Sequence, residues 1–186
     1  MQTPGEATRL LKDWRGGNRG ALDELMGVLY REVHQIASAH MRRESSNTLQ
    51  PTALVNEAYM RLIGLSRMEF SDRSHFLATT ARVIRQTLVD MARRRNAGKR
   101  DGGDRLTLIE EAVGSASGNL DLLELDELLE ELSDIDEMAA RVVELRLFGG
   151  LNIDESAEVL EVSAATVSRK WRTAKAWLKR YYEAAQ

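Results

Sequence analysis

Apolar residues recur at helical spacing along most of the chain, and this pattern restricts the fold more than any other feature. Within residues 18–43, for example, Leu22, Leu25, Leu29 and Val33 fall on one face of a helix. Runs of β-branched or aromatic residues are few, and proline occurs only twice in 186 residues. Such a chain folds into amphipathic helices that bury their apolar faces against one another. We therefore predict an all-α fold.

The predicted helices fall into two groups, which are separated by stretches rich in glycine. The first group covers residues 18–43, a segment from Pro51 to about Gly64, and residues 75–95. The second group covers residues 120–132, 134–147, 153–160 and 164–184. Residues 96–103 and 114–118 between the groups have the composition of loops. We predict two small helical domains, 1–99 and 120–186, joined by a linker over 100–119.

Charge is distributed in blocks, although the chain has a net charge of only −3. Residues 82–105 hold eight arginines or lysines and three aspartates, and residues 164–186 hold six cations and one glutamate. Between these basic segments, residues 106–140 hold eleven carboxylates and no lysine or arginine. Blocks of this kind steer a charged partner more than the net charge does. The two basic segments indicate a nucleic-acid partner.

The sequence lacks residues that several classes of function require. The absence of cysteine excludes a disulfide scaffold, a thiolate zinc site and a cysteine nucleophile. His34 and His40 are six residues apart, so they do not share a helix face well, which favours packing over metal ligation. No Ser-His-Asp set or phosphate-binding glycine loop is recognisable, so we predict no enzyme, no metal and no cofactor. With no signal peptide and no apolar run of the roughly 18 residues that a membrane span needs, we expect a cytoplasmic protein.

The segment 151–178 carries the pattern of a DNA-binding helix-turn-helix. Residues 153–160 predict a short amphipathic helix, and the three residues that follow predict a turn. Ser163, at the end of that turn, is a suitable cap for the next helix. Glu161 stands where such turns often have glycine, which costs roughly 1 kcal/mol if its backbone is left-handed.

The second helix of this motif has an apolar face and an opposite face of small and basic residues. Val167, Trp171 and Ala174 are predicted to point inward, with the tryptophan as a packing anchor. The opposite face suits a recognition helix in the major groove, because small residues at its start allow close approach to base edges. Its predicted DNA contacts are Ser163, Ala164, Thr166, Ser168, Arg169, Lys170, Arg172 and Lys175. On spacing alone, an ordinary helical hairpin with a solvated basic face is the alternative.

These motifs together resemble a known family, the extracytoplasmic-function sigma factors, which are the smallest members of the sigma-70 family. The resemblance covers nearly the whole chain. Residues 120–186 resemble sigma region 4, whose second half is a helix-turn-helix that reads the promoter −35 element. The residues at the spacing of that region are 142–147, Leu151, Ala157, Leu160, Ser163, Thr166 and Val167. Residues 54–62, which read Leu-Val-Asn-Glu-Ala-Tyr-Met-Arg-Leu, resemble the region 2 helix that clamps the polymerase β′ subunit. Residues 76–95 resemble the region 2 helix that contacts the −10 element and its displaced strand.

The resemblance implies a bacterial sigma factor without catalytic activity, which brings core RNA polymerase, through its β′ and β subunits, to selected promoters. The implied −10 contacts are Arg82, Arg85, Gln86, Arg93, Arg94 and Arg95. The implied polymerase contacts are Leu54, Val55, Asn56, Glu57, Tyr59, Arg61 and Leu62. For the arginine run at 93–95, a solvated helix end favoured by the helix dipole is the alternative.

The chain departs from the family pattern near the polymerase-binding helix and in the −10 helix. Residues 50–53 are uncharged, although the family usually has an acidic sequence there. Thr79 and Gln86 stand where the family often has tryptophan and asparagine. Thr52 falls at a common glutamate position, and phosphorylation adds roughly −1.5 to −2 charges. Our hypothesis is that phosphorylation of Thr52 by a Ser/Thr kinase enables polymerase binding, with Ser45, Ser46 and Thr48 as alternative sites. An anti-sigma factor is the alternative regulator, and a simple helix cap is the alternative role of Thr52.

The sequence alone leaves more than one role open for the acidic segment and more than one function open for the whole chain. The acidic segment either follows the RNA exit path of the polymerase, as in the family, or is a solvated tether. A conventional helix-turn-helix repressor or activator and an adaptor that contacts only proteins are the competing functions. Because acidic and basic segments coexist, the free chain can also adopt a compact, autoinhibited arrangement.

Overall fold

The computed structural model describes residues 9–10, 12–13, 16–18, 20–21, 24–25, 27, 56–58, 60–61, 73–98 and 122–184. Four helices are described over their whole length: α4 (Arg73–Gly98), α6 (Leu122–Leu147), α7 (Ile153–Leu160) and α8 (Ala164–Ala184). Helical residues are also described within 9–27 and 56–61. The described residues contain no strand, which confirms the predicted all-α class.

The helix bounds agree with the sequence prediction at the C-terminus and differ from it elsewhere. The bounds of α7 and α8 are those predicted. α6 joins two predicted helices across a kink at Asp136, whose φ of −151° and ψ of 84° are non-helical. α4 runs to Gly98, beyond its predicted end at residue 95, because arginine is a good helix former and cations favour the negative end of the helix dipole. The linker predicted over 100–119 lies outside the described residues, and the domain limits stay predictions.

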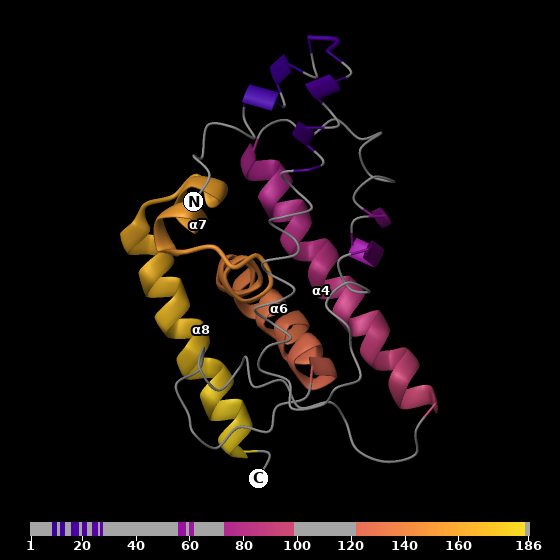
Figure 1. The fold of residues 1–186 in the computed structure, drawn as a ribbon. Helices are drawn as coiled ribbons and strands as arrows, with labels where there is room; N and C mark the ends of the chain where they lie inside the picture. The colour runs from indigo at the N-terminus through magenta and orange to yellow at the C-terminus, as the bar shows by residue number, and fades with distance from the viewer. Residues whose placement is uncertain are drawn as a thin grey trace.

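α6 lies between α4 and α8, and α7 contacts all three (Figure 1). The buried apolar side chains form a core that runs across these helices. Leu88 of α4, Leu129 of α6 and Leu178 of α8 belong to the same cluster. The helix that resembles part of region 2 therefore packs directly on the helices that resemble region 4.

The corner between α6 and α7 requires glycine. Gly150 has a φ of 65°, in the left-handed region that favours glycine. A Cβ on Gly149 would stand 2.5 Å from the Leu145 carbonyl oxygen and 3.1 Å from the Cβ of Ala81 on α4. The corner can approach α4 this closely because Gly149 has no side chain.

Candidate nucleic-acid interface

Hydrogen bonds fix the first residue of both helices in the helix-turn-helix. The Oδ1 of Asn152 accepts from the Glu155 N–H at 2.9 Å, and the Oε2 of Glu155 accepts from the Asn152 N–H at 2.8 Å. This reciprocal pair, a capping box, sets where α7 begins. The Oγ of Ser163 accepts from the Thr166 N–H at 3.1 Å. That bond confirms Ser163 as the cap of α8.

The turn between α7 and α8 holds Glu161 in a left-handed conformation. Its φ is 54° and its ψ is 39°. The Glu161 N–H reaches the carbonyls of Ala157 and Glu158, and the Val162 N–H donates to the Ala157 carbonyl at 3.0 Å. These bonds close the end of α7 as they do when glycine occupies the position. A side chain in this conformation costs roughly 1 kcal/mol, so the surrounding contacts maintain the turn.

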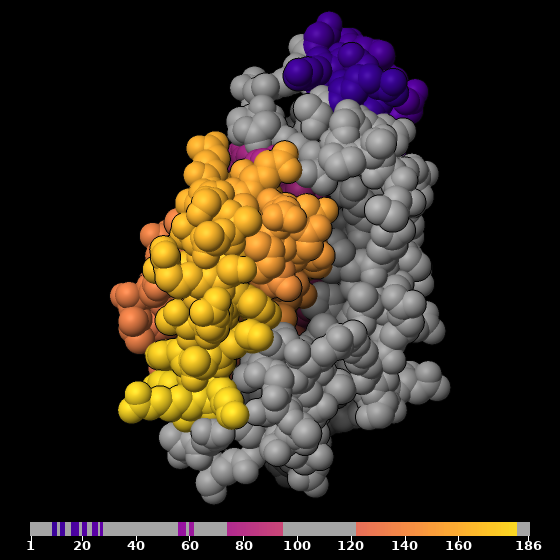
Figure 2. Space-filling model, turned by 90° about the vertical axis from the view of Figure 1, so that its left-hand side faces the viewer, coloured from indigo at the N-terminus to yellow at the C-terminus, as the bar shows by residue number. Residues whose placement is uncertain are grey.

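α8 buries one face and leaves the opposite face open. Val167, Ala174 and Leu178 are buried, as the apolar spacing predicts. Figure 2 shows α8 lying along the surface with α7 beside it. Arg169 and Arg172 are exposed on this helix, and neither has an ion pair or hydrogen bond with another described residue. The small or polar members of the predicted contact set lie around them, half-buried or exposed: Ser163, Ala164, Thr166 and Ser168.

Lys170 differs from these arginines because its ammonium group is paired inside the molecule. Its Nζ lies 2.6 Å from the Oδ2 of Asp136, and the Oδ1 of Asp136 accepts from the Ala139 N–H at 3.1 Å. Burial raises the pKa of Asp136, but the bonds from Lys170 and Ala139 outweigh it and hold that pKa below its usual value. Lys170 thus fastens α8 to the kink of α6, and its contact with DNA stays a prediction.

Trp171 packs α8 against the end of α6 and carries two cations over its ring. The Cζ of Arg146 lies 4.8 Å from the ring centroid, and the Nζ of Lys175 lies 5.5 Å from it. Arg146 also donates to the Leu151 carbonyl at 3.4 Å, and burial lowers its pKa. The tryptophan is a packing anchor, as predicted, and Lys175 is held against it.

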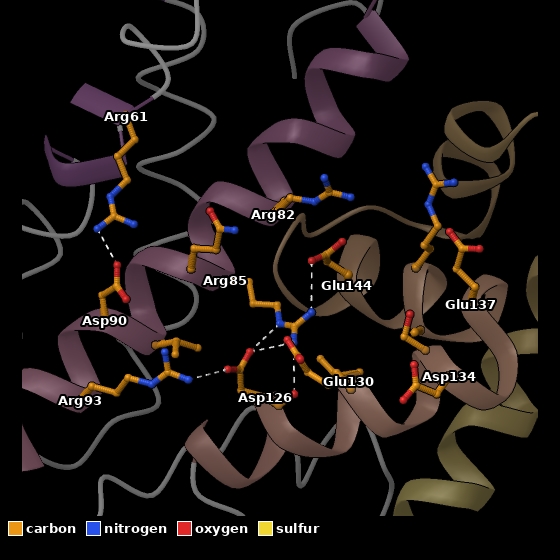
Figure 3. A pocket seen from close by; sticks show the side chains of 16 residues that line it. Arg61, Arg82, Arg85, Asp90, Arg93, Asp126, Glu130, Asp134, Glu137 and Glu144 are labelled. Atoms are coloured by element: carbon orange, nitrogen blue, oxygen red, sulfur yellow. Dashed lines mark hydrogen bonds and ion pairs between the residues drawn. The ribbon is translucent and has the colours of Figure 1, made fainter.

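On α4, Arg85 is surrounded by carboxylates of α6. Its guanidinium nitrogens lie 2.7 Å from Asp126, 3.5 Å from Glu130 and 3.5 Å from Glu144. The side chain of Arg85 is 17% exposed, and those of Asp126 and Glu144 are each 13% exposed. Figure 3 shows the carboxylates converging on this guanidinium. Because water is largely excluded, the attraction is stronger than in a typical surface ion pair.

A cleft of about 830 Å³ lies between α4 and α6, and residues of both charges line it. Arg82 and Gln86 stand exposed on its α4 side, and Arg93 reaches across to within 3.4 Å of Asp126. Figure 3 shows Arg82 without a dashed contact to the residues drawn. The structure therefore brings these predicted −10 residues to one place: Arg82, Arg85, Gln86 and Arg93. The side chain of Arg95 lies outside the described residues.

The described part of the predicted polymerase-binding segment is tied to α4. Arg61 lies 2.7 Å from Asp90 and 3.1 Å from Glu57, and Glu57 lies 3.1 Å from Arg94. The hydrogen bond to Asp90 raises the pKa of Arg61 above its usual value. Arg94 thus pairs with Glu57 of this predicted segment, whereas Arg93 pairs with Asp126 of α6. Asn56 is exposed, and these predicted residues lie outside the described ones: Thr52, Leu54, Val55, Tyr59 and Leu62.

The structure adds residues that the predicted contact sets omit. Asp126 and Glu144 neutralise Arg85. The sequence places Asp126 on the predicted helix 120–132, but no sequence signal pairs it with Arg85, which lies 41 residues earlier. Met60 is 66% exposed in the segment that resembles the polymerase clamp. Methionine is among the residue types enriched at protein interfaces.

Metal ligation and membrane insertion find no support in the residues that the structure describes. Among them, no group of three or more histidine, aspartate or glutamate side chains is placed to hold a metal ion. No described helix is both long and apolar enough to cross a membrane.

Comparison with known proteins identifies the family. The family model described as ECF sigma factor matches residues 4–184. The curated proteins and the solved structures gave no match. The matched range includes the open basic face of α8, the arginines of α4 and the segment tied to α4 at Arg61. Because the match spans nearly the whole chain, this protein belongs to the ECF sigma factors, which are non-catalytic and direct core RNA polymerase to promoters.

Proposed function

We propose that the chain contacts promoter DNA at two places while it is bound to polymerase. α8 reads the −35 duplex, α4 contacts the −10 element, and the segment 54–62 binds the polymerase β′ subunit. The observation that carries this proposal is the open face of α8, where Arg169 and Arg172 are exposed on a helix that follows a tight, well-capped turn. The factor acts where polymerase and chromosome are, in the cytoplasm.

The face of α8 has the chemistry of a major-groove reader. Ala164 and Ala165 at its start leave room for base edges, and an arginine one turn later can donate two hydrogen bonds to a guanine. Arg172, further along the helix, is suited to a phosphate. The helix therefore combines one arginine that reads sequence with another that sets position.

The proposed role of α4 is to hold a promoter strand as the duplex opens. Taking a base out of the stack costs a few kcal/mol, which phosphate and base contacts have to offset. Arg82 and Gln86 are exposed and ready to make such contacts. Arg85 can join them only after leaving Asp126, whereas Arg93 is exposed and shares that carboxylate through a single contact at 3.4 Å.

Transcription with purified components tests the function. The protein is mixed with core RNA polymerase and genomic DNA fragments, and RNA 5′ ends are mapped. We expect starts that are absent without the protein and that share sequence upstream. DNA binding without polymerase-dependent starts would instead indicate a repressor, and neither activity would indicate an adaptor.

We also propose that polymerase binding is controlled at Thr52, which lies outside the described residues. The support is the uncharged sequence at 50–53, where the family usually has acidic residues. A Ser/Thr kinase would restore negative charge there. Core-polymerase affinity of Thr52→Glu should exceed that of Thr52→Ala. Equal, tight binding by both variants would contradict this control and leave an anti-sigma factor as the regulator to seek.

A further inference from the structure

Part of the α4 face that we assign to a promoter strand is occupied by another part of the same chain, although Arg82 and Gln86 stay exposed. Arg85 and Arg93 both pair with Asp126 of α6. We propose that this is the resting state of the free protein, in which α6 competes with nucleic acid for α4 and Arg85 is the central contact. The inference rests on the proposed strand-binding role of α4.

Arg85 has few donors left for another partner. Its Nε donates to the Oδ1 of Asp126 at 2.8 Å, and its Nη2 donates to the Asp126 backbone carbonyl at 3.1 Å. Its Nη1 lies 3.5 Å from the Oε1 of Glu144. All three nitrogens therefore face oxygen atoms of α6. A phosphate can reach this guanidinium only after Asp126 and Glu144 have moved away.

α6 presents its carboxylates in a row opposite the arginines. Asp126, Glu130 and Asp134 recur every fourth residue, which spaces them about 6 Å apart along the helix axis. All three line the cleft, and Arg82 and Arg93 line its other side. A row of anions facing arginines is also what a nucleic-acid backbone forms with a basic protein surface. The acidic side of α6 thus resembles a strand in charge.

Beneath these ion pairs, the contact between α4 and α6 is apolar. Charge is therefore not the only interaction that holds the two helices together. Leu88 and Leu129 belong to one buried cluster, and Gly149 packs against Ala81. Opening exposes this surface to water, which disfavours the open state in the free chain. Binding to core polymerase can favour the open state if polymerase binds it better. Until then, the apparent affinity of α4 for a strand is reduced by the fraction of molecules that are open.

Charge reversal at Asp126 tests the proposal against a matched control one residue away. Asp126→Lys breaks the contacts of Arg85 and Arg93, whereas Glu127→Lys makes the same charge change on an exposed residue that does not line the cleft. The chain has no cysteine, so Glu24→Cys and Thr173→Cys, both exposed, provide a unique pair of sites for spin labels. Pulsed electron paramagnetic resonance measures the distance between the labels. In unlabelled protein, fluorescence anisotropy measures affinity for a short single-stranded DNA of mixed sequence.

We expect Asp126→Lys to lengthen and broaden the distance and to bind the strand at least about tenfold more tightly than Glu127→Lys. Asp126→Asn and Glu127→Gln repeat the comparison with a smaller change, and circular dichroism checks that each variant is folded. An unchanged distance in both Asp126 variants would overturn the proposal. So would a longer distance without tighter strand binding.

Transcription with core polymerase separates this proposal from the function on which it rests. If the wild-type chain directs promoter-specific starts but the Asp126 variants bind strands no better, the competition by α6 is wrong and the function stands. If the wild-type chain directs no such starts, the proposed function itself is wrong.

Discussion

α8 and α4 carry the same kind of charge, yet the free chain leaves one open and covers the other. On α8, Arg169 and Arg172 are exposed without a partner among the described residues. On α4, Arg85 is enclosed by carboxylates and is 17% exposed. The difference lies in how each helix meets α6. α8 packs its apolar face on α6, and although Lys170 pairs with Asp136 there, Arg169 and Arg172 stay exposed. α4 instead presents Arg85 and Arg93 to the acidic side of α6.

This comparison suggests an order of events at a promoter. In the proposed roles, the face of α8 needs no rearrangement before it meets duplex DNA, whereas Arg85 of α4 has to be uncovered before it can meet a strand. In that proposal Arg85 does not contact a strand until polymerase has separated α4 from α6, whereas Arg82 and Gln86 are exposed from the start. The experiments below change one side of the comparison at a time.

The largest effect is expected at the open face. Arg169→Ala should weaken binding of the polymerase holoenzyme to a promoter duplex by about tenfold to a hundredfold, because one base contact of arginine contributes about 1–3 kcal/mol. Thr173→Ala, exposed on the same helix and outside the predicted contact set, is the control. Anisotropy with a duplex taken from a mapped promoter provides the measurement. Equal affinities of the two variants would show that α8 does not read DNA through Arg169.

The next effect concerns the corner that approaches the covered helix. Gly149→Ala places a Cβ 2.5 Å from the Leu145 carbonyl oxygen and 3.1 Å from Ala81, so the free energy of unfolding should fall by about 1–3 kcal/mol. Gly27→Ala is the matched control, since a Cβ there meets no atom within 4 Å and alanine favours a helix. Urea unfolding compares them. A Gly149 variant as stable as the wild type would mean that the corner is looser than the structure shows.

The sequence predicts the bounds of α7 and α8 correctly because those bounds depend on residues that are close together in the chain. Ser163 caps α8 through a bond to Thr166, three residues away, and such pairs can be read directly from the order of residues. The ion-pair partner of Arg85 cannot be predicted from nearby residues. Its partner Asp126 is 41 residues further along the chain, and an arginine on a helix face has the same pattern whether it meets a phosphate or a carboxylate. The pairing of Lys170 with Asp136 cannot be predicted from the sequence for the same reason, because the two residues are 34 positions apart.

A smaller effect, which depends on pH, is expected where α8 is fastened to α6. The folded chain holds the pKa of Asp136 below its usual value, so this carboxylate stabilises the fold at neutral pH and loses that effect as pH falls through its lowered pKa. Asp136→Asn should therefore lower the free energy of unfolding by about 1 kcal/mol at neutral pH, and the difference from wild type should vanish in acid. Glu127→Gln removes a charge from an exposed residue of the same helix that does not line the cleft, so its free energy of unfolding should stay close to that of the wild type. Urea unfolding across the acidic range measures both, and a deficit of Asp136→Asn that persists in acid would contradict the ion pair.

The smallest effect is expected in the turn that aims the open helix. Glu161 has a φ of 54°, and glycine accepts this conformation without strain. Glycine also increases the entropy of the unfolded chain, so the net gain in stability of Glu161→Gly should be only about 0.5 kcal/mol. Glu161→Gln removes the charge but keeps the Cβ, so it should show no gain in thermal unfolding. If the bonds from the turn to Ala157 and Glu158 set the direction of α8, Glu161→Gly keeps the −35 affinity of the wild type. A drop in that affinity without loss of stability would instead show that the strained residue itself aims the recognition helix.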